Sequence, residues 1–180
     1  GLSFKLKGGA NYINFRDSAT FFPSGSNDYG VNGTKVIRIS INDNSSWLDP
    51  STVRFMFDIQ NKNPNSALYP AGGVHGFFRR IRVLVGGSVV EDFEYNRVTE
   101  MFSLFNTKEN RMNDTIEGFS VEAESAGDIS TVIKAGQAGY GIRAGRHQTV
   151  GMKIHCGIFN QLKYLPLKYM GNGGITIELE

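Results

Sequence analysis

Three histidines are the residues of this 180-residue chain best suited to hold a metal ion, namely His75, His147 and His155. Metal-dependent β enzymes such as cupins bring closely spaced histidines and a carboxylate around one ion. Here the histidines are scattered, and no His-x-His motif occurs. His155 falls on the polar face of the expected strand Thr149–Cys156, which indicates a surface histidine. We therefore predict no metal site.

The acidic run Glu91–Glu94 has the residue types of a general acid–base pair, in which one carboxyl group donates a proton and another accepts one. The hairpin that contains this run gives it a different role. Its expected register places Glu91 opposite Arg82 and Glu94 opposite Arg79. Cross-strand ion pairs of this kind each contribute about 0.2–1 kcal/mol. We therefore expect these charges to stabilise a sheet rather than to perform catalysis.

Two further features have the composition of a reactive site. Cys156 is the single cysteine, and it lies on the apolar side of its strand, where a buried and unreactive thiol is expected. The glycines of Gly139–Gly141, followed by Gly145, resemble a phosphate-binding loop. No strand precedes them and no Lys-Ser/Thr follows, so a flexible loop is the better interpretation. No catalytic, cofactor-binding or metal-binding residue is predicted, and no enzymatic activity or cofactor is expected.

A β-hairpin is the clearest structural element in the sequence. The alternating run Phe77–Val85 is followed by Gly86-Gly87 and by the returning run Ser88–Phe93. A two-residue Gly-Gly turn is typical of such hairpins and fixes their register. The expected cross-strand pairs are Val85 with Ser88, Leu84 with Val89, Val83 with Val90, and Arg82 with Glu91.

Alternation of apolar and polar residues predicts further strands on both sides of the hairpin. Their ranges are Asn11–Arg16, Lys35–Asn42, Ser51–Gln60, Thr149–Cys156 and Ile175–Leu179. A helix is expected near Tyr95–Asn106, and its buried face would carry Tyr95, Val98, Phe102 and Phe105. Half-buried alternation repeated this often, with one helix, favours an all-β, antiparallel two-sheet sandwich.

The segment Lys108–Gln148 is predicted to be a long loop inserted in this domain, in which Ser120–Glu122 and Ser130–Lys134 could each form a short strand. It holds few apolar residues, too few to offset the entropy of ordering it alone. We expect this loop to be mobile in an isolated protomer and to become ordered by packing on a neighbouring subunit or on a second domain of the same protein.

Composition excludes several classes of protein. The formal net charge is +2, which is too small to imply a nucleic-acid groove or an anionic membrane partner. In the expected hairpin register, only Arg80 of the basic cluster Arg79–Arg82 lacks an acidic partner. One cysteine excludes an internal disulfide framework, and no apolar run approaches the roughly 20 residues needed to span a bilayer. The length suits one domain, 1–180.

The order of these motifs resembles the first jelly roll of the double jelly-roll major capsid proteins of icosahedral double-stranded DNA viruses, most nearly the polinton-like and virophage-like members. The resemblance covers the chain from about Asn11 to Glu180. It rests on the following segments: Phe77–Val83, Gly86-Gly87, Glu91–Phe93, Tyr95–Arg97, Phe159-Asn160, Leu165–Leu167 and Gly173–Leu179. Family members carry two rolls in tandem, whereas this chain has residues for one. Either a second roll lies on another part of the protein, or this is a single-roll capsid protein.

The resemblance implies an eight-stranded antiparallel jelly roll whose function is assembly. Three copies of the two-roll protein would form a trimer with a pseudo-hexameric outline, and these capsomers would tile an icosahedral shell. Implied partners are the other subunits, neighbouring capsomers, the second roll, and penton and minor capsid proteins. Neither a sequence-specific nucleic acid nor a membrane span is implied. The expected location is the virion, assembled inside the host cell.

Other classes of function stay open. A single-roll penton, adhesion or spike module fits the composition almost as well as a major capsid protein does. A carbohydrate-binding sandwich would need aromatic residues on an exposed surface, and the candidates are Tyr12, Trp47 and Tyr69. These fall in or beside turns rather than in a stripe along a strand.

Overall fold

A computed structural model describes residues 13, 15–66, 68, 73–107, 142, 144–171 and 173–180 of the chain. The chain divides into two compact units. The first comprises Gly1–Val53, Arg80–Phe93 and His155–Glu180, and the second comprises Arg54–Arg79 and Glu94–Ile154. Each unit holds one antiparallel sheet, and the second also holds the α-helix. The predicted β-rich class, with antiparallel sheets and one helix, is confirmed.

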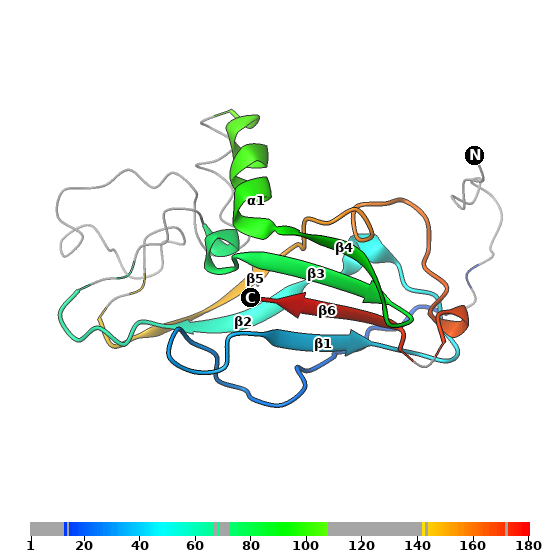
Figure 1. Ribbon diagram of the computed structural model, residues 1–180, viewed down its shortest axis with the longest axis horizontal. Coiled ribbons are helices and arrows are strands. Elements are labelled where there is room, and N and C mark those ends of the chain that lie inside the picture. Colours follow the sequence, from blue (N-terminus) through cyan, green and yellow to red (C-terminus); the bar gives the residue numbers. More distant parts are fainter. Residues whose placement is uncertain are drawn as a thin grey trace. The chain divides into compact units, whose positions relative to one another are not determined.

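The sheet of the first unit has four strands in the order β1-β6-β3-β4 (Figure 1). Their bounds are β1 Ile37–Ile41, β6 Ile175–Leu179, β3 Arg80–Val85 and β4 Ser88–Glu94. Strand β6 runs antiparallel to both of its neighbours, so that Ile177 pairs with Ile39 on one side and with Val83 on the other. Strands from three distant parts of the sequence therefore meet at β6.

One face of this sheet is an aliphatic core. Alternate residues of β1, β3 and β6 are buried there: Ile39 and Ile41 of β1, Ile81 and Val83 of β3, and Ile175, Ile177 and Leu179 of β6. Because successive side chains of a strand point to opposite faces, the intervening residues lie on the other face. Burial of each such side chain contributes about 1.5–3 kcal/mol. This packing fixes the register of β6 between its two neighbours.

Glycines close two turns at one end of the sheet. Gly86 and Gly87 have φ values of 56° and 85° and form the predicted two-residue turn between β3 and β4. Gly174 has a φ of 52°, and a Cβ atom built there would clash with the carbonyl oxygen of Ile41. Glycine is therefore required immediately before β6 both by backbone conformation and by space.

The sheet of the second unit pairs β2, Phe55–Gln60, with β5, His147–Met152. The register brings Phe55 opposite Met152 and Phe57 opposite Val150. The ring of Phe78 packs edge-on against the rings of Phe55 and Phe57, with centroids 5.6 and 5.2 Å away. Phe55 and Phe78 of this aromatic cluster are buried.

The helix α1, Tyr95–Leu104, is anchored by its first residue. Tyr95 is fully buried, its backbone N–H donates to the carbonyl of Arg79, and its hydroxyl lies 2.9 Å from Nδ1 of His75. Thr99, one turn later, is buried as well. The predicted burial of the other end is wrong, because Phe102 is 48% exposed and Phe105 is 81% exposed. The helix is held at its N-terminal end and leaves its apolar C-terminal end exposed.

Short 3-10 helices occupy several of the connections. They are η1 Pro50–Thr52, η2 Val74–Phe77 and η3 Leu167–Tyr169. Phe77 was expected in the hairpin but belongs to η2, so β3 begins at Arg80. The six strands named here are those of the described residues. Residues 13, 15 and 16 of the expected strand Asn11–Arg16 are not in a strand, and the other residues of that range lie outside the described part.

The predicted strand Thr149–Cys156 is observed as His147–Met152, two residues earlier at its start and four at its end. The expected loop Lys108–Gln148 therefore ends before His147. Most of that loop, residues 108–141 and 143, lies outside the described residues, and so do Ser120–Glu122 and Ser130–Lys134.

Candidate functional site

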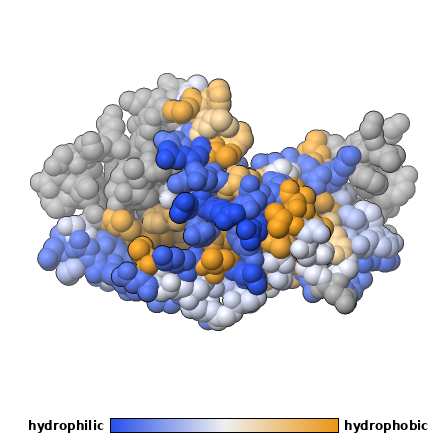
Figure 2. Space-filling view, viewed as in Figure 1, coloured by the Kyte–Doolittle hydropathy of each residue, from blue (hydrophilic) through white to orange (hydrophobic). Residues whose placement is uncertain are grey.

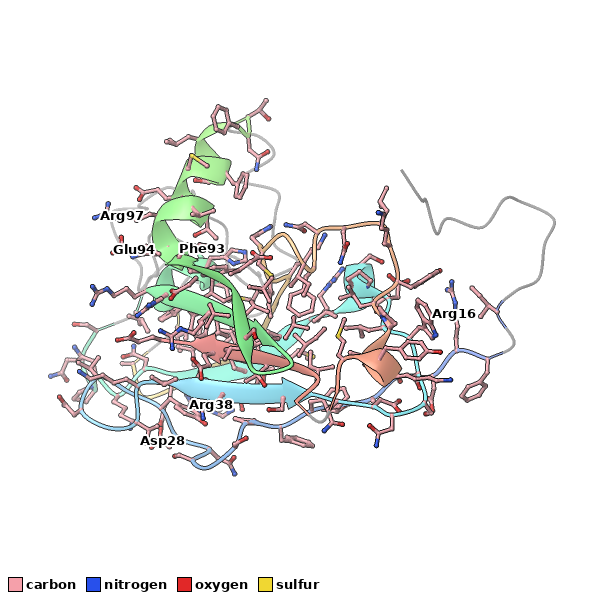
Figure 3. The ribbon with its side chains drawn as sticks, turned by 45° about the vertical axis from the view of Figure 1, so that its right-hand side comes forward. Arg16, Asp28, Arg38, Phe93, Glu94 and Arg97 are labelled. Atoms are coloured by element: carbon pink, nitrogen blue, oxygen red, sulfur yellow. The ribbon has the colours of Figure 1, made fainter. Side chains whose placement is uncertain are left out.

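A chain of ion pairs crosses all four strands on the polar face of the first sheet. Arg38 of β1 contacts Glu178 of β6, at 2.8 Å from its Nε to Oε1. The second carboxylate oxygen of Glu178 lies 3.4 Å from Arg82 of β3, and Arg82 in turn lies 3.4 Å from Asp92 of β4. Figure 3 labels Arg38, which stands at one end of this chain of contacts. The ion pairs therefore run across the sheet from β1 to β4.

Asp92 accepts a bidentate contact from one arginine of this face. Arg80 donates to both of its oxygens, from Nε at 2.7 Å and from Nη2 at 2.6 Å. The hydrogen bond with Arg80 lowers the pKa of Asp92, and the same contact raises the pKa of Arg80. A bidentate pair of this geometry is the strongest kind of Arg–carboxylate contact. It is, however, exposed to solvent, which limits its contribution to stability.

The expected partnership of Arg82 with Glu91 is wrong. Arg80 and Arg82 lie two apart on β3 and share one face, and both reach Asp92. Arg80, expected to lack an acidic partner, lies closer to Asp92 than Arg82 does. Asp92 therefore takes the place expected for Glu91, whose carboxylate contacts the loop at Gly157. Arg80 and Arg82 still meet carboxylates, so neither indicates a nucleic-acid patch.

Glu91 instead holds a loop. Its two carboxylate oxygens accept hydrogen bonds from the backbone N–H groups of Gly157, at 2.9 Å, and Ile158, at 2.7 Å. A Cβ atom at Gly157 would come within 3.1 Å of Glu91 Oε1, so the close approach favours glycine. A carboxylate that accepts two backbone N–H groups orders the loop as a helix cap orders a helix terminus. The role of Glu91 is therefore structural.

Cys156 is buried beside this loop, as predicted. Burial raises the pKa of its thiol to about 12, and the negative charge of Glu91 acts in the same direction. The thiolate is the reactive form of cysteine, and it is scarce at neutral pH when the pKa is this high. The environment of Cys156 is the opposite of one that activates a nucleophile.

The histidines fall into different surroundings. His75 is buried against Tyr95 and His147 lies exposed at the start of β5, whereas His155 follows the end of that strand. Across the part of the chain that the structure describes, no group of three or more His, Cys, Asp or Glu residues is placed to hold a metal ion. The glycine-rich candidate Gly139–Gly141 lies outside that part.

An aromatic pair links a loop to the 3-10 helix η3 within the first unit. Trp47 meets Tyr169 at a ring centroid distance of 6.4 Å and an interplanar angle of 82°. The two rings are exposed, at 50% for Trp47 and 70% for Tyr169. Sequence reasoning identified Trp47 but missed Tyr169, because the two residues are distant in the chain and only the fold brings them together. The other aromatic candidates, Tyr12 and Tyr69, lie outside the described residues.

Exposed apolar side chains gather on the last turn of α1. This apolar helix end consists of Met101, Phe102, Leu104 and Phe105, and apolar colouring marks it in Figure 2. Monomeric proteins rarely expose several large apolar side chains together, and such patches are typical of contact sites. Searched over the same described residues, no helix has both the length and the apolar character to cross a membrane.

Comparisons with known proteins add no family. No protein-family model matches the chain, and neither a curated protein nor a solved structure matches it. Any statement of function therefore depends on the residues and contacts described above.

Proposed function

We propose that this chain is a structural protein of a viral capsid and that its function is self-assembly. The proposal extends the β-rich fold to an eight-stranded jelly roll, of which the described strands form part. Trimers with a pseudo-hexameric outline would tile an icosahedral shell. A single-roll penton or spike protein is the alternative form of the same proposal. Assembly of this kind requires neither a catalytic step nor a cofactor.

The observation that carries the proposal is the apolar helix end. Phe105 is 81% exposed at the end of α1, beside three other large apolar side chains. Leaving such groups in water forgoes about 1.5–3 kcal/mol for each, and contact with another subunit recovers it. Shells are stabilised by many modest interfaces that symmetry repeats, and the apolar helix end would form part of one such interface in every subunit.

The polar face of the first sheet supports the same interpretation. Its guanidinium and carboxylate groups are used in contacts with one another, from Arg38 to Asp92. Each of its three arginines, Arg38, Arg80 and Arg82, contacts a carboxylate, and such contacts stiffen a scaffold. Association would therefore depend on apolar side chains and loops rather than on this face.

The experiment is to express the chain and measure its mass by light scattering across a concentration series, with electron microscopy of the products. We expect trimers and larger closed particles. The double variant Leu104→Lys with Phe105→Lys should remain folded and lose assembly, because charged residues would have to be buried at the contact. The control is Val31→Lys, at an exposed valine of the first unit.

A chain that stays monomeric at every concentration would contradict the proposal. Assembly that is unchanged in the double variant would retain self-assembly but remove the apolar helix end from the contact.

A further inference from the structure

The loop that precedes β1 is closed by backbone hydrogen bonds at two levels. At its base, the N–H of Ser24 donates to the carbonyl of Arg38, at 2.8 Å. Nearer the tip, the N–H of Gly30 donates to the carbonyl of Thr34, at 3.3 Å, and the N–H of Gly33 donates to the carbonyl of Gly30, at 3.1 Å. The loop therefore has a fixed base and a tip that is held by longer hydrogen bonds.

Asn32 and Gly33 lie at this tip, and both are exposed. The side chain before them, Val31, is 86% exposed. A Cβ atom built at Gly33 would meet nothing within 4 Å, and the φ of Gly33 is not positive. The backbone nitrogen of Gly33 is therefore screened by no side chain of its own, and open space adjoins it where that side chain would be.

The chain contains a second Asn-Gly sequence, Asn172-Gly173, in a different setting. Asn172 lies outside the described residues, but Gly173 is described. A Cβ atom at Gly173 would lie 3.5 Å from the backbone nitrogen of Gly87 and 3.6 Å from the Cα atom of Gly86. Gly173 thus packs against the turn between β3 and β4, whereas Gly33 packs against nothing.

An exposed asparagine without a following glycine offers another comparison in the first unit. Asn44 is exposed, and the next residue is Ser45, which carries a Cβ atom. The backbone N–H of Ser45 also donates to the carboxylate of Asp43, at 2.8 Å. A hydrogen bond to a charged acceptor is stronger than one between neutral groups, so this nitrogen is both shielded and held.

We propose that Asn32 is the preferred site of deamidation in the folded chain, a modification that converts its side-chain amide to a carboxylate. The backbone nitrogen of Gly33 gives its proton to a base in the solvent and attacks Cγ of Asn32. A bond from this nitrogen to Cγ forms, the bond from Cγ to Nδ2 breaks, and Nδ2 leaves as ammonia. Water then opens the cyclic imide at either carbonyl carbon, which gives aspartate or isoaspartate. Water is the only co-reactant, and nothing is oxidised or reduced.

The hydrogen bond from Gly33 to the carbonyl of Gly30 opposes this reaction, because the nitrogen must first give it up. Breaking one exposed backbone hydrogen bond slows the reaction by roughly tenfold at most. The missing Cβ atom acts in the other direction, since glycine reaches backbone conformations that a side chain would exclude. The product adds one negative charge to a chain of formal net charge +2, at an exposed loop tip. The site is independent of self-assembly, because it uses neither the apolar helix end nor the second unit.

To test this, the full chain is incubated at mildly alkaline pH, and each asparagine is followed by peptide mass spectrometry, with isoaspartyl methyltransferase to detect isoaspartate. We expect Asn32 to convert roughly tenfold faster than Asn44, because Ser45 carries a Cβ atom and Gly33 does not. Asn32 should also convert faster than Asn172 in the folded chain, and urea should remove that difference. Gly33→Ala should slow the conversion of Asn32 without unfolding the protein, since a Cβ atom there meets nothing.

Circular dichroism and the melting temperature show whether Gly33→Ala is folded. If it is not, the comparison of Asn32 with Asn44 and Asn172 in the wild-type chain decides the question. The proposal is overturned if Asn32 converts no faster than either of these residues in the folded protein. It is also overturned if a folded Gly33→Ala variant converts at the wild-type rate, because the Gly33 nitrogen would then not be the attacking group.

Discussion

Arg80 holds Asp92 through both nitrogens of one edge of its guanidinium group, at 2.7 and 2.6 Å. The contact joins β3 to β4, and Arg82 extends it towards Glu178 of β6. The charged side chains of the hairpin therefore help to hold the sheet together. Because Asp92 can be protonated, the stability of the sheet depends on pH.

The pH dependence of stability follows from the lowered pKa of Asp92. A carboxyl group whose pKa is depressed on folding stabilises the folded state above its unfolded pKa, which is about 3.9. That stability is lost as the pH falls through the folded pKa. We expect Asp92→Asn to reduce the difference in stability between pH 7 and strongly acidic pH, measured by urea denaturation. Glu100→Gln is the control, because its pair with Arg97 is 4.0 Å long and exposed. Identical pH profiles for the wild type and Asp92→Asn would contradict this.

Glu91→Ala should destabilise the first unit by roughly 1.5–3 kcal/mol, because two backbone N–H groups of the loop lose a charged acceptor. Glu91→Gln keeps one carbonyl oxygen as acceptor and should cost less. Chemical denaturation measures both, and hydrogen exchange at Gly157 and Ile158 should increase. Unchanged exchange at these two amides would show that the loop is held by other contacts.

Gly174→Ala should cost about 1–3 kcal/mol or more, because the new Cβ would meet the carbonyl oxygen of Ile41 and the residue has a φ of 52°. Gly87→Ala is the matched control. Its φ is 85°, but a Cβ atom there meets nothing within 4 Å, so it isolates the conformational cost of about 1 kcal/mol. Equal losses in the two variants would mean that the Ile41 carbonyl moves without cost.

The two ends of α1 should respond differently to truncation. Tyr95→Ala removes a fully buried ring and should cost about 3–5 kcal/mol, whereas Phe105→Ala should change the stability of the protomer by less than about 0.5 kcal/mol. Tyr95→Phe tests the contact with Nδ1 of His75 separately and should cost about 1 kcal/mol. A large loss for Phe105→Ala in the monomer would restore the original expectation that this ring is buried.

Cys156 should resist alkylation in the folded protein. Burial and the pKa of about 12 keep the thiol protonated and covered, so iodoacetamide at pH 8 should react far more slowly than with the unfolded chain. Mass spectrometry over time measures the rate, and added urea should increase it. Rapid labelling without denaturant would show that this part of the first unit opens readily.

Local patterns were sufficient for some elements and not for others. Strand β6 was predicted with its observed bounds, because the alternation of Ile175, Ile177 and Leu179 with polar residues is encoded within five positions. The turn at Gly86-Gly87 was predicted for the same reason. The partner of Arg82 was missed, because alternation and turn length do not say which of the adjacent carboxylates Glu91 and Asp92 reaches the arginine and which reaches a distant loop.

The candidate site depended more strongly on the fold. The helical spacing of Phe102 and Phe105 predicted an apolar face correctly, but spacing alone does not say whether a face meets the core or solvent. Tyr169 meets Trp47 because long-range contacts, among them the pairing of Leu48 with Leu165, bring the two segments together. Such a long-range contact leaves no trace in the neighbouring residues of either ring.

The place of β6 between β1 and β3 constrains the order of events during translation. A ribosome releases β1, β3 and β4 well before β6, so for most of synthesis the hairpin and β1 each present an unpaired edge. Sheet closure must wait for a strand more than a hundred residues downstream of β1, and such non-local closure is slow and prone to aggregation. A nascent chain of this topology would therefore benefit from a chaperone that shields those edges until Ile175–Leu179 has emerged.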